Sequence, residues 1–167
     1  MARKKKNLSD VNQSIYANTS GMHIGVVVAD WNTEITSALL QGAVNTMKSM
    51  GVEEKNIHVH YVPGSYELPM GAKLLATALK VDAVICLGCV IQGETRHFEF
   101  ISNAVANGIT SVGLETNIPV IFGVLTTDNY QQAKDRAGGK HGNKGDEAGA
   151  TAIKMIELKR ILQNKPR

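Results

Sequence analysis

The sequence predicts an α/β fold in which a parallel sheet lies between two layers of helices. Two observations support this prediction. Short apolar runs alternate along the chain with longer segments in which apolar residues recur at helical spacing. The short runs are apolar almost throughout, as expected for strands that are buried on both faces of a parallel sheet. We therefore expect a three-layer α/β/α sandwich around a four-stranded parallel sheet.

The individual elements follow from the same pattern. The expected strands are four apolar runs: 23–29, 57–62, 81–91 and 118–127. The expected helices are the segments after them: 32–51, 66–80, 97–107, 128–139 and a final one from about 146 to 162. Asn32 or Thr33 can cap the first helix and Gly51 can end it. Pro69 is tolerable in the first turn of the second helix, and Gly108 is expected to end the third. For the sheet we expect a flavodoxin-like strand order.

Composition and charge describe one globular domain. The chain has 167 residues, of which 43% are apolar and 20% charged, and this length is enough for one substantial core. The first ten residues hold four of the 18 Lys and Arg residues and one of the 15 acidic residues, so the remainder carries 14 of each. We predict a flexible basic and polar segment over residues 1–20, a single domain over 21–167, and no nucleic-acid partner.

The expected location rests on features that the sequence lacks. No apolar run approaches the roughly 18 residues of a membrane span. The basic N-terminal residues are not followed by the apolar stretch and cleavage site of a secretory signal. We expect a cytoplasmic protein with no membrane partner.

Cys86 and Cys89 have the C-x-x-C spacing that occurs in some zinc and redox sites. Both lie in an apolar run, where an offset of three places them on opposite faces of a strand. No second Cys/His pair is placed in the sequence to complete a metal site. We therefore expect two core cysteines and no metal.

Unusual polar and aromatic residues gather where the expected strands end. In open α/β sheets, ligands bind outside the carboxyl ends of the strands. The segments at those ends contain the only tryptophan and most of the unusual polar residues: DWN (30–32), PGSYE (63–67), GCVIQGETRH (88–97) and FGVLTT (122–127). We predict the functional site at this edge of the sheet.

The turn before the third expected helix can bind an anion. Gly93, Glu94 and Thr95 precede a helix N-terminus, whose dipole and free N–H groups attract phosphate, although simple capping would use the same residues. His97 would lie beside this turn and can transfer protons near neutral pH, but a surface or capping role also fits it. Neither a Walker A motif nor G-x-G-x-x-G occurs, so we expect no nucleotide cofactor.

Three aromatic residues and one acid complete the expected site. Trp31 and either Tyr66 or Phe122 can stack on a flat heterocycle. Glu67 can accept hydrogen bonds from ring N–H groups. The alternatives are core packing for the aromatic side chains and an electrostatic role at a helix N-terminus for Glu67.

These segments are similar to those of the lumazine synthase family. The similarity is carried by DWN, VPGSYELP, CVIQGETRHFEFI and FGVLTTDNYQQAKDRAGGKHGNKG, in order and suitably spaced over roughly His23 to Leu162. The G-E-T-x-H-F and R-A-G-x-K-x-G-N-K-G blocks together are highly specific. The resemblance implies a transferase of riboflavin biosynthesis that condenses 5-amino-6-(D-ribitylamino)uracil with 3,4-dihydroxy-2-butanone 4-phosphate. The products would be 6,7-dimethyl-8-ribityllumazine, phosphate and water, and neither a metal nor an organic cofactor would take part.

The resemblance also implies a role for each site residue. The pyrimidine and its ribityl chain would contact one group: Trp31, Ser65, Tyr66, Glu67, the backbone of Cys89, Val90 and Ile91, and Phe122. The butanone phosphate would contact a second group: Glu94, Thr95, Arg136 and Lys140. His97 would transfer protons during imine formation and phosphate loss. Relatives usually carry Phe in place of Trp31 and many carry Arg in place of Gln92, so this chain brings no charge at position 92.

The family assembles as pentamers, and some members form icosahedral shells of twelve pentamers. We therefore expect a homo-oligomer, and the short segment AGGKHGNKG resembles the shell-forming members. The segment SIYA (14–17) is expected to add an edge strand to the sheet of a neighbouring subunit. Each site would combine residues of two adjacent chains: Trp31, Glu67 and His97 of one with Phe122 and Arg136 of the next.

Two other functions compete with this interpretation. A flavodoxin-like flavin-binding carrier shares the sheet type, but it would need a phosphate loop after the first strand, and ADWNTEIT lacks the glycine of such a loop. A catalytically inactive shell protein is the second alternative. The presence of His97 and Arg136 counts against it.

Overall fold

Four parallel strands form the central sheet of the computed structural model, which describes residues 7–11 and 18–163. The strands are β1 (Ile24–Ala29), β2 (Ile57–Val62), β3 (Ala83–Ile91) and β4 (Val120–Thr127). Their order in the sheet is β2-β1-β3-β4, which confirms the predicted flavodoxin-like order. The segment SIYA lies outside the described residues.

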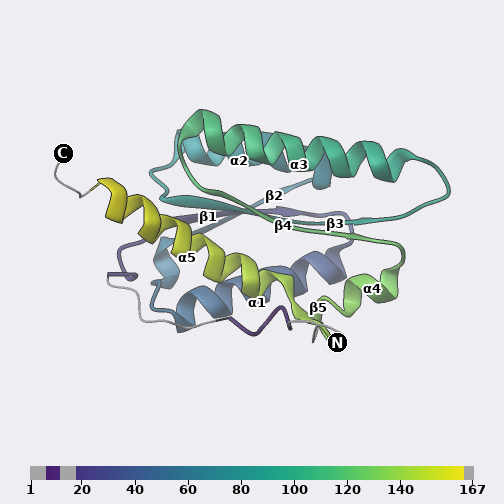
Figure 1. The fold of residues 1–167 in the computed structure, drawn as a ribbon, viewed down its shortest axis with the longest axis horizontal. Helices are drawn as coiled ribbons and strands as arrows, with labels where there is room; N and C mark the ends of the chain where they lie inside the picture. Colours follow the sequence, from purple (N-terminus) through teal and green to yellow (C-terminus); the bar gives the residue numbers. More distant parts are fainter. Residues whose placement is uncertain (1–6, 12–17, 164–167) are drawn as a thin grey trace, which may run out of the picture.

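Helices cover both faces of this sheet, so the predicted three-layer sandwich is confirmed. The helices are α1 (Thr33–Ser49), α2 (Leu68–Ala78), α3 (His97–Thr116), α4 (Tyr130–Lys134) and α5 (Lys144–Gln163). Figure 1 shows α2 and α3 over one face and α1 and α5 over the other. Two 3₁₀ turns, Glu54–Asn56 and Ser65–Glu67, precede β2 and α2. Within the described residues, no helix combines the length and the apolar character that crossing a membrane requires.

The two layers of helices bury separate apolar cores, and the two cysteines divide between them. Cys89 belongs to the core under α1 and α5, and Cys86 to the core under α2 and α3. They lie on opposite faces of β3, as their spacing predicted. Burial raises the pKa of the Cys89 thiol to about 11 and raises that of Cys86 as well. Both thiols are therefore neutral core groups at neutral pH.

The third helix is longer than the sequence predicted. It continues through Gly108 to Thr116, and Asn117, in a left-handed conformation with φ 53°, ends it. A Cβ atom at Gly108 would lie 2.7 Å from Cγ of Pro69 on α2. The glycine therefore allows close packing of α3 against α2 and does not mark a helix end.

The segment after β4 differs from the predicted single helix. Only residues 130–134 of the predicted helix over 128–139 are helical. Two short strands, β5 (Ala137–Gly139) and β6 (Gly142–Asn143), then pair as an antiparallel ribbon. The final helix begins at Lys144, earlier than predicted.

Part of the N-terminal segment lies against this ribbon. The backbone N–H of Leu8 donates to the carbonyl of His141 at 2.8 Å. The backbone N–H of Asn143 donates to the Ser9 hydroxyl at 2.9 Å. The domain boundary after residue 20 and the flexibility of residues 1–20 stay predictions.

Candidate active site

A cavity of about 380 Å³ lies at the carboxyl ends of the strands, at the edge where the sequence predicted the site. The turns after β1, β2 and β3 and the start of α3 form its walls. The lining residues are Trp31, Asn32, Gly64, Ser65, Tyr66, Glu67, Cys89, Val90, Ile91, Gly93, Thr95, His97, Phe98 and Ile101. All the predicted site residues are among them except four: Glu94, Phe122, Arg136 and Lys140.

Two aromatic side chains stand at the opening of the cavity. Trp31 is 73% exposed and Tyr66 is 60% exposed. The core-packing interpretation is therefore wrong for both, and their ring faces are accessible to a flat ligand. The backbone N–H of Trp31 donates to the carbonyl of Pro63 at 3.1 Å. This bond joins the turn after β1 to the turn after β2, which carries Tyr66.

Asn32 lies at the predicted cap position, but its side chain makes a different hydrogen bond from a capping one. It occupies the N-cap position of α1 with φ 63°, but its side chain makes no capping hydrogen bond. Its amide donates instead to the carbonyl of Cys89 at 3.0 Å. Asn32 thus belongs to the wall of the cavity, a role that sequence reasoning missed. Asn tolerates the left-handed region more readily than most residues, and its place directly after a buried strand was the available signal.

Two polar side chains of the 65–67 turn have unused hydrogen-bonding capacity. Ser65 is buried, and its hydroxyl has no partner among the described residues. Gly88 provides the space for it, since a Cβ atom there would lie 2.7 Å from Ser65 Oγ. Glu67 begins α2, but its carboxylate makes no capping hydrogen bond. The buried Ser65 hydroxyl and the half-buried Glu67 carboxylate can therefore both make hydrogen bonds to a ligand.

The turn between β3 and α3 exposes a row of hydrogen-bond donors. Among the described residues, no acceptor takes the backbone N–H groups of residues 93–96. They precede a helix of 20 residues, whose dipole adds positive potential at this end. The N–H of His97 donates to the Thr95 hydroxyl at 3.3 Å, which leaves the hydroxyl hydrogen of Thr95 free. This arrangement suits an anion such as phosphate.

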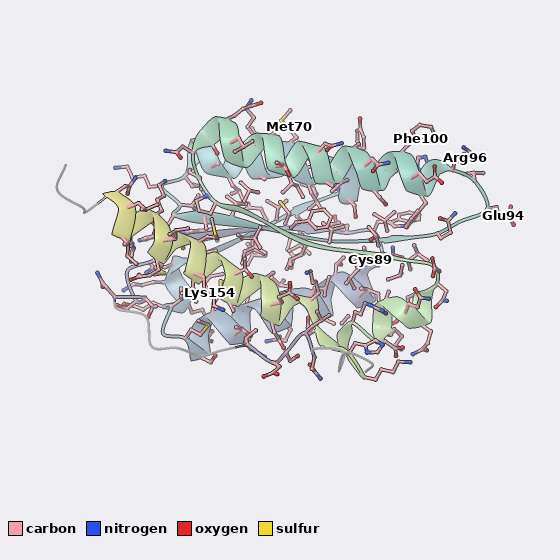
Figure 2. The ribbon with its side chains drawn as sticks, viewed as in Figure 1. Met70, Cys89, Glu94, Arg96, Phe100 and Lys154 are labelled. Carbon is pink, nitrogen blue, oxygen red and sulfur yellow. The ribbon has the colours of Figure 1, made fainter. Side chains whose placement is uncertain are left out.

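Glu94 contributes to this turn through its backbone. Its side chain projects from the tip of the turn, away from the sheet (Figure 2). A carboxylate pointing into an anion site would repel the anion. The outward orientation removes this conflict and leaves the N–H of Glu94 as its useful group.

The sequence predicts Phe122 at the carboxyl end of its strand, and this prediction is wrong. Phe122 is near the start of β4, beside Cys86 in the middle of β3. Its side chain is 36% exposed and lines a separate hollow of about 380 Å³ together with Lys144 and Met155 of α5. Within one chain, Phe122 is not part of the cavity.

Arg136 and Lys140 are also outside the cavity of their own chain. The guanidinium of Arg136 donates to the carbonyl of Gln132 at 2.9 Å, which fixes it at the end of α4. Lys140, in the turn between β5 and β6, lies 2.9 Å from the Asp135 carboxylate. The Lys140 ammonium, followed by the Gln131 amide, holds the pKa of Asp135 below its ordinary value. Both cations are on the surface of α4 and the adjoining ribbon.

The described part of the chain has no cluster of metal-ligating side chains. Within residues 7–11 and 18–163, no three His, Cys, Asp or Glu side chains are grouped so that they could hold a metal ion. The chemistry that the cavity offers is stacking, hydrogen bonding, anion binding and proton transfer by His97.

The matching family model and the similar proteins described next carry the same family name. The model of the family described as 6,7-dimethyl-8-ribityllumazine synthase matches residues 21–160. A protein of that name from Cytophaga hutchinsonii is 60% identical over 156 residues, which are 93% of this chain and 98% of the relative. A second, from Parabacteroides distasonis, is 53% identical over 95% of this chain and 99% of its own length. A third, from Clostridium kluyveri, is 50% identical over 87% of this chain and 95% of its own length. This chain belongs to the 6,7-dimethyl-8-ribityllumazine synthase family.

Proposed function

We propose that this chain condenses 5-amino-6-(D-ribitylamino)uracil with 3,4-dihydroxy-2-butanone 4-phosphate to form 6,7-dimethyl-8-ribityllumazine, the penultimate step of riboflavin biosynthesis. Family membership supports the reaction. The observation that carries it is the cavity itself, in which accessible aromatic rings, an unpartnered hydroxyl and an anion-binding turn with His97 lie together. Such a transferase would work in the cytoplasm, where we place this chain.

The direct test mixes the purified protein with both substrates and follows lumazine fluorescence and phosphate release. We expect the two products to appear in equal amounts, and neither to appear when one substrate is left out. A protein that instead binds flavin mononucleotide stoichiometrically and undergoes reversible reduction would support the flavodoxin-like alternative. A protein that assembles normally but gives no product would support an inactive shell.

The pyrimidine would lie in the half of the cavity formed by the turns after β1 and β2. Trp31 would stack on its ring, and Tyr66 would pack beside it. The Ser65 hydroxyl and the Glu67 carboxylate would supply the hydrogen bonds that their own chain leaves unmade. The backbone of residues 89–91, at the end of β3, would contact the opposite edge of the ring.

The butanone phosphate would lie against the turn after β3. The N–H groups of residues 93–96 and the hydroxyl of Thr95 would bind the phosphate oxygens. His97, on the first turn of α3, would then face the reacting carbons. Imine formation moves protons between nitrogen and oxygen, and an imidazole does this near neutral pH.

Among the described residues that line the cavity there is no Lys or Arg, and a second copy can supply such a cation. We propose that Phe122 and Arg136 of one subunit complete the cavity of its neighbour, with Lys140 near the phosphate. Arg136 is half-buried at the end of α4 and lies outside its own cavity. Charge-assisted contacts from Arg to phosphate are among the strong hydrogen bonds of proteins.

Two different apolar surfaces support this head-to-tail contact. The first follows the outer side of α2 and α3, where Tyr66, Met70, Leu74 and Phe100 are each more than half exposed; Figure 2 shows Met70 and Phe100 on the side away from the sheet. The second runs from Phe122 over Met155, Leu158 and Leu162 of α5 and includes two hollows of about 380 and 540 Å³. Two dissimilar patches fit a ring, because a cyclic interface brings unlike surfaces together.

The ring would be the pentamer of the resembled family, and we propose a shell of twelve pentamers. The second surface includes β4, which is an edge strand of the described sheet, so ring formation would also cover an open edge. SIYA is proposed to add to the sheet of a neighbour. Light scattering and electron micrographs test this assembly. Particles of the mass of free pentamers would contradict the shell, and monomers would contradict the ring.

A further inference from the structure

We propose that the side-chain amide of Gln92 is a positioning group that holds the 93–96 turn with its N–H groups facing the bound phosphate. The proposal rests on the phosphate subsite proposed above and adds to it a residue that does not itself touch the ligand. Gln92 directly follows β3, and its backbone N–H donates to the carbonyl of Thr127 on β4 at 2.8 Å. The residue is therefore fixed to the sheet at its backbone, while its side chain is exposed.

The side chain of Gln92 contacts two carbonyl groups of the turn. Its Nε2 atom donates to the carbonyl of Gly93 at 2.9 Å and makes a longer contact of 3.5 Å with the carbonyl of Thr95. In a trans peptide the carbonyl of one residue and the N–H of the next point in opposite directions. Binding these two carbonyls therefore turns the N–H groups of Glu94 and Arg96 away from Gln92.

We place the cavity on the side of the turn opposite the Gln92 amide, because Gly93 and Thr95 line it and Gln92 does not. The Glu94 carboxylate projects outward from the tip and does not compete for the space (Figure 2). The peptide groups are thus divided, with carbonyls bound to the Gln92 amide and N–H groups left for an anion.

Little else restrains the turn. Residues 92–96 are all exposed, and a Cβ atom placed on Gly93 would meet no atom within 4 Å. Because packing does not order the turn, its local hydrogen bonds must do so. Without the Gln92 amide, the turn would have to be ordered when phosphate binds, and this cost would weaken binding.

The test replaces Gln92 by Met, which has a similar length but no donor. Gln41→Met is the matched control, because Gln41 is an exposed glutamine of α1 whose amide donates at 2.7 Å to Asn45, outside the cavity. Binding of inorganic phosphate is measured by calorimetry, and the KM of each substrate from product fluorescence. We expect the phosphate Kd and the KM of the butanone phosphate to rise together in Gln92→Met by about three- to tenfold. The KM of the pyrimidine and all constants of Gln41→Met should stay at the wild-type values.

A rescue variant separates positioning from a general structural effect. Gln92→Arg restores N–H donors of similar reach, so we expect it to bind phosphate at least as tightly as the wild type. An unchanged phosphate Kd in Gln92→Met, an equal rise in both KM values, or a Gln92→Arg variant as weak as Gln92→Met would overturn the proposal. Phosphate binding needs no turnover. A wild-type protein that binds phosphate in a Gln92-dependent way but forms no lumazine would therefore refute the proposed function alone, and one that forms lumazine but binds no phosphate would refute the role of Gln92 alone.

Discussion

The side-chain amide of Asn32 donates to the backbone carbonyl of Cys89 at 3.0 Å, and so joins the end of β1 to the end of β3 in the wall of the cavity. The bond depends on an uncommon backbone, because Asn32 has φ 63°. It fixes the carbonyl of a residue whose backbone is proposed to contact the pyrimidine. One side chain therefore serves both the turn into α1 and the shape of the site.

Replacing Asn32 separates these two contributions. Asn32→Gly keeps the left-handed conformation but loses the amide, and we expect it to lower the free energy of unfolding by about 0.5–1.5 kcal/mol. Asn32→Ala also places a Cβ atom in that conformation and should lose about 1–2 kcal/mol more. Denaturant unfolding at one fixed subunit concentration measures both values, because oligomer stability depends on concentration. Equal stabilities of the two variants would contradict the backbone contribution.

Glycine-to-alanine changes at two positions of α3 should have opposite effects. Gly108→Ala places a Cβ atom 2.7 Å from Cγ of Pro69, and we expect this overpacking to cost about 1–3 kcal/mol. Gly113→Ala is the control, since its Cβ would meet no atom closer than 3.5 Å. It should stabilise the helix by about 0.5–1 kcal/mol because alanine loses less backbone entropy. Thermal unfolding of the two variants distinguishes these effects, and a stabilised Gly108→Ala would contradict the packing role.

The contrast between these glycines shows what the sequence could predict about the fold. The four strands and their buried character follow from local apolar runs, and their order from the connections between them. The role of Gly108 depends on Pro69, far away in the chain, so its local pattern predicted a helix end that does not exist. The paired strands β5 and β6 escaped notice for a related reason, because their glycine-rich residues have low strand propensity.

The site residues also divide into those that the sequence could place and those that depend on contacts distant in the chain. The rule that ligands bind at the carboxyl ends of parallel strands brought Trp31, Ser65 and His97 to one cavity correctly. It could not identify Asn32, whose contribution depends on a contact with the next strand but one in the sequence. It also could not place Phe122 and Arg136, which lie outside the cavity of their own chain. Their proposed place depends on a second subunit, which no pattern within one chain describes.

The buried thiol of Cys89 should make stability fall at high pH. Burial raises its pKa from 9.0 to about 11, so between these values the unfolded chain loses the proton while the folded chain keeps it. The protonated thiol therefore contributes to the free energy of unfolding. This contribution is fully present below pH 9 and is lost as the pH rises toward 11, at up to about 1.4 kcal/mol per pH unit. We expect the free energy of unfolding of the wild type to fall more steeply over this range than that of Cys89→Ala. If the free energies of unfolding of the wild type and Cys89→Ala changed with pH in parallel, the raised pKa of Cys89 would be contradicted.

His97→Ala tests the proton-transfer role. General acid–base help contributes roughly 10²–10⁴-fold to a rate, so we expect kcat to fall by about that factor. Binding of the pyrimidine substrate, measured by titration without the butanone phosphate, should be retained because stacking and the Ser65 hydroxyl do not involve the imidazole. Turnover close to the wild-type value would show that another group moves the protons.

Mixed rings test whether one active site takes residues from two chains. His97→Ala and Arg136→Ala should each be inactive, the second because it loses a charge-assisted phosphate contact. The two variants are unfolded together in equal amounts and refolded, and each variant refolded alone is the control. If the site lies between neighbours, each site needs an intact His97 from one subunit and an intact Arg136 from the next.

Random assembly then gives both intact residues at about a quarter of the sites, and activity should recover to roughly that fraction of the wild type. If both residues of a site came from one chain, every chain in the mixture would carry one defect, and mixing could not create an intact site. Mass spectrometry of the refolded rings confirms that they contain both variants. Activity that stays at the level of the separate variants in such rings would rule out the shared site, and Arg136 would then have to reach the cavity of its own chain, outside which it lies here.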